Sequence, residues 1–149
     1  MELSFEAGGW WSYALVFLAA ATPVLEVLVV VPAAILTGMA PVPVTVLAVA
    51  GNVTTLAMVV VAADRLSERW QASRGGPGRR AQRARQLARR WGVPGLAALG
   101  PVSTGSHIAA LAAVAVGAGR MRVLGWMTGG VVAWGVTAAG AAVLGLGAT

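Results

Sequence analysis

One ionisable side chain interrupts a long apolar sequence near the start of the chain. Between Glu6 and Asp64 the only charged residue is Glu26, and the run around it is long enough to cross a membrane. A charge at that depth costs about 3 kcal/mol on insertion scales, so it is normally kept only where a polar partner or a wet cavity receives it. Glu26 is therefore the first candidate for a functional residue.

The composition places the chain among integral membrane proteins. Of its 149 residues, 58% are apolar and 11% are charged, and the mean hydropathy is +0.78. A helical crossing needs about 20 apolar residues, so we expect a single all-α membrane domain with about four apolar helical units. Met1 to Gly9 carries acids and no basic residue, unlike the start of a signal peptide, and we expect it to belong to the mature chain.

The chain offers little for metal or cofactor chemistry. It has no cysteine, one histidine and five acidic residues, which excludes a disulfide framework and a thiolate site and argues against a protein-built metal cage. Ser106 beside His107 is poorly placed for nucleophilic catalysis, because neighbours in sequence do not readily face each other. We expect neither an enzyme nor a cofactor.

The basic residues gather in one segment. All eleven are arginines, and nine lie between Arg65 and Arg90. Such a cluster beside apolar spans indicates the cytoplasmic side, so we expect residues 64–92 to be cytoplasmic. Within it we expect a helical extension over 64–73, a break over 74–78 and a basic helix over 79–91. Its partners are then anionic lipid headgroups and not nucleic acid.

Four apolar stretches, about 11–39, 43–63, 94–118 and 123–146, allow two topologies. If all four cross, Arg120 and Arg122 lie outside and the acidic N-terminus lies inside, against the usual bias. If the first and third dip into the membrane and return, every arginine is cytoplasmic and the N-terminus is outside. The charges favour the second arrangement, in the cytoplasmic membrane of a bacterial-type cell.

Both stretches contain the break that a re-entrant hairpin needs. The first break is Ala21-Thr22-Pro23 and the second is the run from Gly100 to His107. Non-helical backbone at membrane depth requires protein or a wet cavity to satisfy it, so two breaks predict a shared polar interior. The alternative is a pair of proline-kinked helices that cross completely.

The two halves have similar spacing. Pro23 precedes Gly51 by 28 residues, and Pro101 precedes Gly129 by the same number. Each half then consists of a re-entrant helical hairpin and a transmembrane helix, the first over about 11–63 and the second over about 93–147. Because the arginine segment is on one side, the halves enter from opposite faces, which is the inverted-repeat plan of many transporters.

The spacing of several residues resembles a known family. In the first half a proline, a glutamate and a second proline follow one another at positions 23, 26 and 32, before a Gly-x-x-Pro turn and a Gly-Asn pair. The second half carries Gly95-Leu96 before Pro101. Over about residues 14–146 the chain resembles the small multidrug export proteins, which are themselves similar to the DedA-type membrane proteins. That resemblance implies two re-entrant hairpins in inverted orientation. The matching residues of the first half are Pro23, Glu26, Pro32, Gly38, Pro41, Gly51 and Asn52.

The chain departs from the family beside Glu26. The family continues with Leu-Arg-Gly, whereas this chain has Val27-Leu28-Val29, so a local Glu-Arg pair cannot form. We expect His107, at the second break, to replace the arginine and share a proton with Glu26. The alternative is that His107 bonds a neighbouring carbonyl and that Glu26 is protonated against Asn52 or Thr54.

The second break also suggests a binding site. Small hydroxyl residues and glycine before an apolar helix expose backbone N–H groups, and a helix N-terminus attracts anions. An ordinary serine or threonine N-cap explains the same residues equally well. The candidate substrate-binding residues are Pro23, Asn52, Pro101, Ser103, Thr104, Gly105 and Ser106.

Three functions fit these observations. The favoured one is a small secondary transporter, proton-coupled through Glu26 and His107, that moves a small polar or anionic solute or a lipid. A passive channel and a non-transporting scaffold with a lipid-binding basic loop are the alternatives. A transporter of this size encloses little volume by itself, so we expect a homo-oligomer, and among homo-oligomers we favour a dimer.

Overall fold

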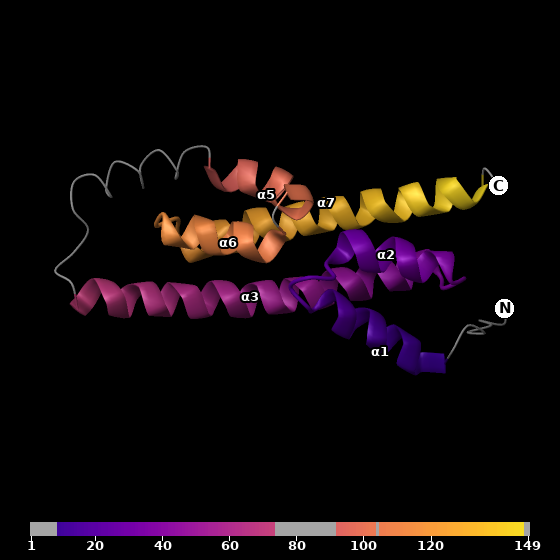
Figure 1. Ribbon diagram of the computed structural model, residues 1–149, viewed down its shortest axis with the longest axis horizontal. Coiled ribbons are helices and arrows are strands. Elements are labelled where there is room, and N and C mark those ends of the chain that lie inside the picture. The colour runs from indigo at the N-terminus through magenta and orange to yellow at the C-terminus, as the bar shows by residue number, and fades with distance from the viewer. Residues whose placement is uncertain (1–8, 74–91, 104, 148–149) are drawn as a thin grey trace. The chain divides into compact units, whose positions relative to one another are not determined.

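The computed structural model describes residues 9–73, 92–103 and 105–147, and within these residues the regular structure is helical, with no strand (Figure 1). Two helices, α3 and α7, are long and apolar enough to cross a membrane, over Pro41–Leu66 and Arg120–Gly145. The others are too short to cross alone. The elements are α1 (Gly9–Ala20), α2 (Val27–Leu36), α3 (Pro41–Ser73), α5 (Val93–Ser103), α6 (Ser106–Ala115) and α7 (Arg120–Gly147).

The expected all-α membrane architecture is confirmed at this level. The first and third apolar stretches are each divided into two short helices, and the second and fourth form the two long ones. The expected extension over 64–73 is part of α3. The break over 74–78 and the basic helix over 79–91 lie outside the described residues.

The chain divides into two compact units, one formed by residues 1–54 and 131–149 and the other by residues 55–130. In the first unit α1 contacts α2, and the two pack with the first part of α3 and the last part of α7. Branched side chains of α2 pack against them, and between membrane helices such packing stabilises through van der Waals contact. The core residues are Val16, Ala20, Val27, Val30, Val31, Ile35, Met39, Val44, Ala48, Val131, Ala138 and Ala142.

The second unit is built from the same kinds of element. α5 packs on α6, and both contact the last part of α3 and the first part of α7. Here α6 presents alanines, so its neighbours approach closely, as small residues allow between membrane helices. The core residues are Leu56, Val60, Val93, Ala97, Ala109, Ala110, Ala113, Val114, Ala118, Val123 and Met127.

The second short helix of each unit ends in the same cap. Gly38 follows α2 with φ +90°, and Gly117 follows α6 with φ +83°. The N–H of Gly38 donates to the carbonyl of Ile35, and the N–H of the next residue donates to that of Ala34. At the second cap the N–H of Gly117 and that of the next residue donate to the carbonyls of Val114 and Ala113. Glycine supplies this left-handed conformation at little steric cost.

A glycine also lies at each contact between a long helix and the first short helix of the same unit. A Cβ built on Gly51 of α3 would collide with the carbonyl oxygen of Phe17 in α1, and one built on Gly130 of α7 would collide with that of Ala97 in α5. The sequence spacing had matched Gly51 with Gly129. The structure instead matches it with Gly130, whereas Gly129 has nothing within 4 Å of such a Cβ.

The two long helices run antiparallel in each unit. In the second unit Arg120, at the start of α7, lies 3.9 Å from Asp64 of α3, measured from Nη1 to Oδ2. In the first unit the start of α3 and the end of α7 border an apolar groove of about 560 Å³, which Pro41, Thr45 and Leu144 help to line.

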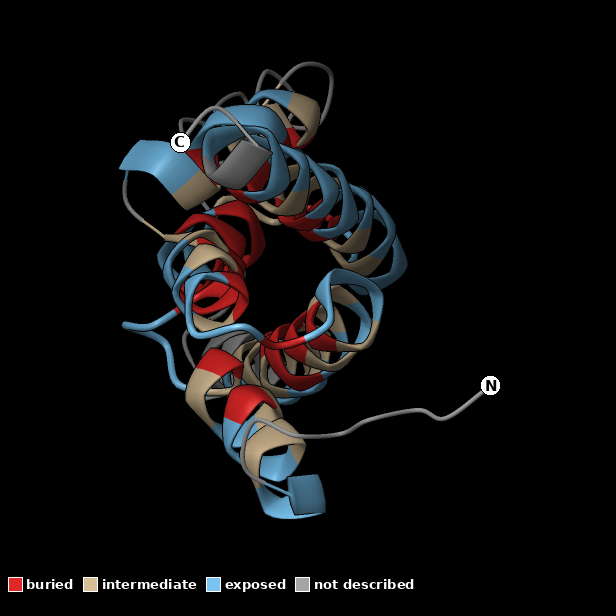
Figure 2. Cartoon of the chain, turned by 90° about the vertical axis from the view of Figure 1, so that its right-hand side faces the viewer, coloured by how far each residue is buried: buried red, intermediate tan, exposed pale blue. Residues whose placement is uncertain are grey.

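Large apolar side chains cover much of the outer surface. Many residues of the helices are exposed (Figure 2), and in the most apolar part of α3 and of α7 only 28% and 22% is buried. A core helix of a water-soluble protein would be mostly buried, so this surface fits contact with lipid. Trp10, Trp11 and Trp126 are exposed, and tryptophan is enriched where membrane helices meet the lipid headgroups.

Candidate functional site

The second break is a tight turn between packed helices. α5 continues as a helix through Gly100 and Ser103, and α6 begins at Ser106, so most of the expected break from Gly100 to His107 is helical. Before α6 the backbone of Gly105 has φ +88°, and its N–H donates to the carbonyl of Gly100 at 2.7 Å. A Cβ on Gly100 would come within 2.6 Å of Ala109 Cβ, so glycine lets α5 lie directly on α6.

This turn places a buried histidine against the long helix α3. His107 is 3% exposed, and its Nε2 lies 3.0 Å from Oγ1 of Thr55. Its Nδ1 lies 3.4 Å from Oγ of Ser106, which is fully buried. A polar group taken out of water must keep hydrogen bonds, and here two hydroxyls supply them. One partner of the ring is thus a hydroxyl of another helix, and the alternative that His107 bonds a neighbouring carbonyl stays a prediction.

Glu26 begins the second short helix of the first unit. It is the N-cap residue of α2, is 6% exposed, and its carbonyl accepts hydrogen bonds from the N–H groups of Val29 and Val30. Its side chain does not cap that helix. The N-terminal end of a helix carries partial positive charge, which favours a carboxylate at this position.

The remaining candidates are spread over several elements. Pro23 is exposed in the link between α1 and α2, Asn52 is fully buried on α3, and Pro101 is half-buried within α5. Ser103 is exposed, and its hydroxyl donates to Leu99 of its own helix at 2.8 Å. Thr104 lies outside the described residues.

Among the described candidates, Gly105, Ser106 and His107 are consecutive residues at the start of α6 in the second unit. Gly105 is the N-cap of α6 and makes no side-chain cap, so the expectation of a serine or threonine N-cap is wrong for the residues that the structure describes. Thr54, an expected partner of Glu26, donates its hydroxyl to Ala50 of its own helix at 2.7 Å. Glu26 and His107 belong to different units, and their sharing of a proton stays a prediction.

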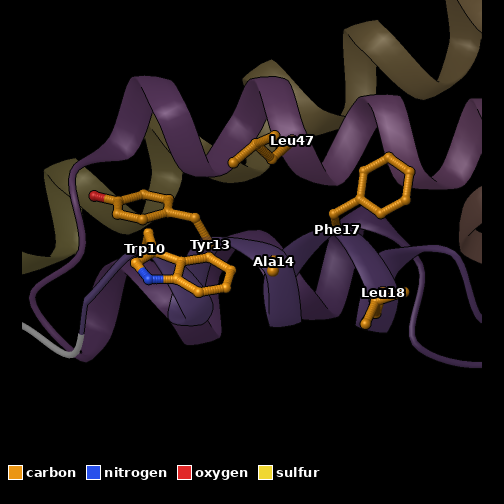
Figure 3. A pocket seen from close by; sticks show the side chains of 6 residues that line it. All are labelled: Trp10, Tyr13, Ala14, Phe17, Leu18 and Leu47. Carbon is orange, nitrogen blue, oxygen red and sulfur yellow. The ribbon is translucent and has the colours of Figure 1, made fainter.

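Open apolar pockets lie away from these residues. One of about 450 Å³ lies between α1 and α3 in the first unit (Figure 3), where Tyr13 and Phe17 of α1 approach Leu47 of α3. It contains none of the predicted site residues. The buried polar side chains of the described residues lie instead at the start of α2 (Glu26), on α3 (Asn52) and at the start of α6 (Ser106 and His107).

A family model described as "Putative small multi-drug export protein" matches residues 26–137, which is more than half of the chain. The chain belongs to this family. No curated protein and no solved structure matches it.

In this member of the small multidrug export family the matched region begins at Glu26 and includes the whole of α5 and α6. The resemblance expected from the sequence is thereby confirmed. Among the described residues, no group of three or more His, Cys, Asp or Glu side chains lies close enough together to hold a metal ion.

Sequence reasoning missed Thr55. It lies one helical turn after Asn52 on α3, and a threonine in an apolar helix usually bonds its own backbone, as Thr54 does. The signal for Thr55 is its position three residues after a buried Asn, on the same side of the helix. Its contact with a residue 52 positions later is not visible in the sequence.

Proposed function

We propose that the protein is a small proton-coupled secondary transporter that moves a small polar or anionic solute, or a lipid, across the cytoplasmic membrane. One observation carries the proposal: each unit has a broken pair of short apolar helices, and the second helix of each pair begins with a buried titratable side chain. Glu26 is the N-cap of α2, and His107 is the second residue of α6. Buried ionisable groups in apolar helices mark proton and substrate pathways.

The proposal includes an inverted repeat of two re-entrant hairpins. Its support is local and independent in each unit. The caps at Gly38 and Gly117 use equivalent hydrogen bonds. At Gly51 and at Gly130, an added Cβ would meet a backbone carbonyl of the equivalent short helix in each unit. Both pairs of glycines are 79 residues apart, as a duplicated unit requires. Discontinuous helices of this kind form the substrate sites of many transporters.

The ion pair of Asp64 with Arg120 supports the hairpin topology. If the stretch from 94 to 118 crossed the membrane, these residues would lie at opposite ends of a span of 26 residues, about 39 Å apart at 1.5 Å per residue. They are 3.9 Å apart. The proposed topology therefore has the N-terminus outside and Arg120 on the same side as the arginine-rich segment 64–92, in the cytoplasm.

Within this plan Ser106 and Gly105, beside His107 in the second unit, would receive the polar group of the solute. The arginine-rich segment would contact anionic lipid headgroups, because each cation near such a surface gains about 1 kcal/mol. A homodimer would supply the walls that two short hairpins lack. These assignments follow from the chemistry of the residues and the size of the chain.

Transport is tested with purified protein in liposomes that contain a pH-sensitive dye. Anionic lipids, organic cations and small anions are offered one at a time, against liposomes without protein. We expect at least one solute to change the internal pH only when protein is present. Electrogenic flux without a pH change would indicate a channel, and no flux across the panel would contradict the transporter proposal.

A further inference from the structure

Both ring nitrogens of His107 face a hydroxyl oxygen within the second unit. The hydroxyl of Thr55 on α3 is 3.0 Å from Nε2, and that of Ser106 on α6 is 3.4 Å from Nδ1. A neutral imidazole has one donor and one acceptor, whereas a hydroxyl can donate or accept. The ring can therefore keep both contacts in either neutral tautomer, and a protonated ring can donate to both oxygens.

We propose that Thr55 is the positioning residue of His107: its hydroxyl holds the Nε2 edge of the ring against α3, and the tautomer that predominates depends on whether this hydroxyl donates to Nε2 or accepts from it. The tautomer of a histidine is set by the hydrogen bond that its other nitrogen makes. The contact also joins the hairpin helix α6 to the long helix α3. A change in protonation of the ring would therefore alter a hydrogen bond between the two helices.

Thr55 has the stronger claim to this role than Ser106. Its contact with the ring has ordinary hydrogen-bond length, whereas 3.4 Å is long for such a bond. Ser106 is the immediate neighbour of His107, so it moves with the ring and cannot fix it relative to α3. His107 is 3% exposed, so water is poorly placed to replace a lost hydroxyl.

The chain is well suited to a direct test, because His107 is its only histidine. Protein with ¹⁵N-labelled histidine is prepared in lipid nanodiscs as wild type, Thr55→Val and Thr55→Ser. Thr54→Val is the matched control, because the Thr54 hydroxyl bonds Ala50 of its own helix. The ¹⁵N resonances of the ring distinguish the two neutral tautomers.

We expect Thr55→Val to move the Nε2 resonance and redistribute the tautomers, and Thr55→Ser and Thr54→Val to match the wild type. Identical ring spectra for wild type and Thr55→Val would overturn the inference. Should Thr55→Val fail to fold, the distance from Thr55 Cβ to His107 Nε2, measured in the wild type by solid-state NMR, decides the question. Separated side chains would overturn the inference, and adjacent ones support it.

The inference deepens the proposed transport function and rests on it only for its effect on flux. We expect Thr55→Val to lower flux about tenfold, the size of one buried hydrogen bond, and Thr55→Ser to restore it. If the wild type moves no solute but Thr55→Val alters the ring spectrum, the transport proposal fails and the positioning role stands. If the wild type transports a solute and Thr55→Val leaves the ring spectrum unchanged, the positioning role fails and the transport proposal stands.

Discussion

Gly130→Ala is expected to destabilise the protein by about 3 kcal/mol, the upper part of the usual range for overpacking, whereas Gly129→Ala should be tolerated. The new methyl group would collide with the carbonyl oxygen of Ala97 and would lie 3.4 Å from its Cβ. A backbone carbonyl cannot rotate away as a side chain can, so α5 and α7 must separate. Thermal unfolding in detergent and the fraction of monodisperse protein measure the effect.

The neighbouring glycine provides the control. A Cβ on Gly129 meets nothing within 4 Å, and alanine is the better helix former by about 1 kcal/mol. Gly51→Ala should behave like Gly130→Ala, because its methyl group would collide with the carbonyl of Phe17. Equal stability of the Gly129 and Gly130 variants would contradict the close packing of α5 on α7.

Glu26→Gln is expected to lower solute-coupled proton movement about a hundredfold without loss of folded protein. The amide has nearly the same volume as the carboxyl group but cannot gain or lose a proton, and a positioned proton-transfer group contributes about 10²-fold or more. Stability should stay the same or rise, because an ionised group in an apolar helix is costly. The measurement is internal pH in liposomes on addition of a transported solute.

Glu26→Asp is the matched variant for this prediction. It keeps the acid and shortens the side chain by one methylene, so part of the proton movement should remain. Full activity in Glu26→Gln would rule out a proton-carrying role for this residue. Absence of solute-coupled proton movement in the wild type and in both variants would favour a non-transporting scaffold.

The sequence was informative about the helices and their interruptions. Apolar length predicted the two long helices, and proline and glycine located the divisions of the first and third stretches. The charges at Arg120 and Arg122 favoured a topology that the ion pair with Asp64 supports. These features are local or depend on charge, so they can be read without knowing which helices touch.

Contacts between helices were harder to predict. Nothing in the sequence distinguishes Gly129 from Gly130, because the difference is which one faces α5. The run from Gly100 to Ser103 is helical although it contains Pro101; the proline removes one helical hydrogen bond, and α5 ends two residues later. Thr55 was overlooked because its partner lies on a helix far along the chain.

The most direct test of the whole account is the side of the membrane on which residue 119 lies. The chain has no cysteine, so single cysteines at Ala40, Leu66 and Gly119 each give an unambiguous labelling signal with an impermeant thiol reagent. All three positions are exposed, and Gly119 has open space for a side chain. Two re-entrant hairpins predict that residue 119 labels from the same side as residue 66 and that residue 40 labels from the other. Labelling of residue 119 together with residue 40 would show that the third stretch crosses the membrane, and would contradict the account.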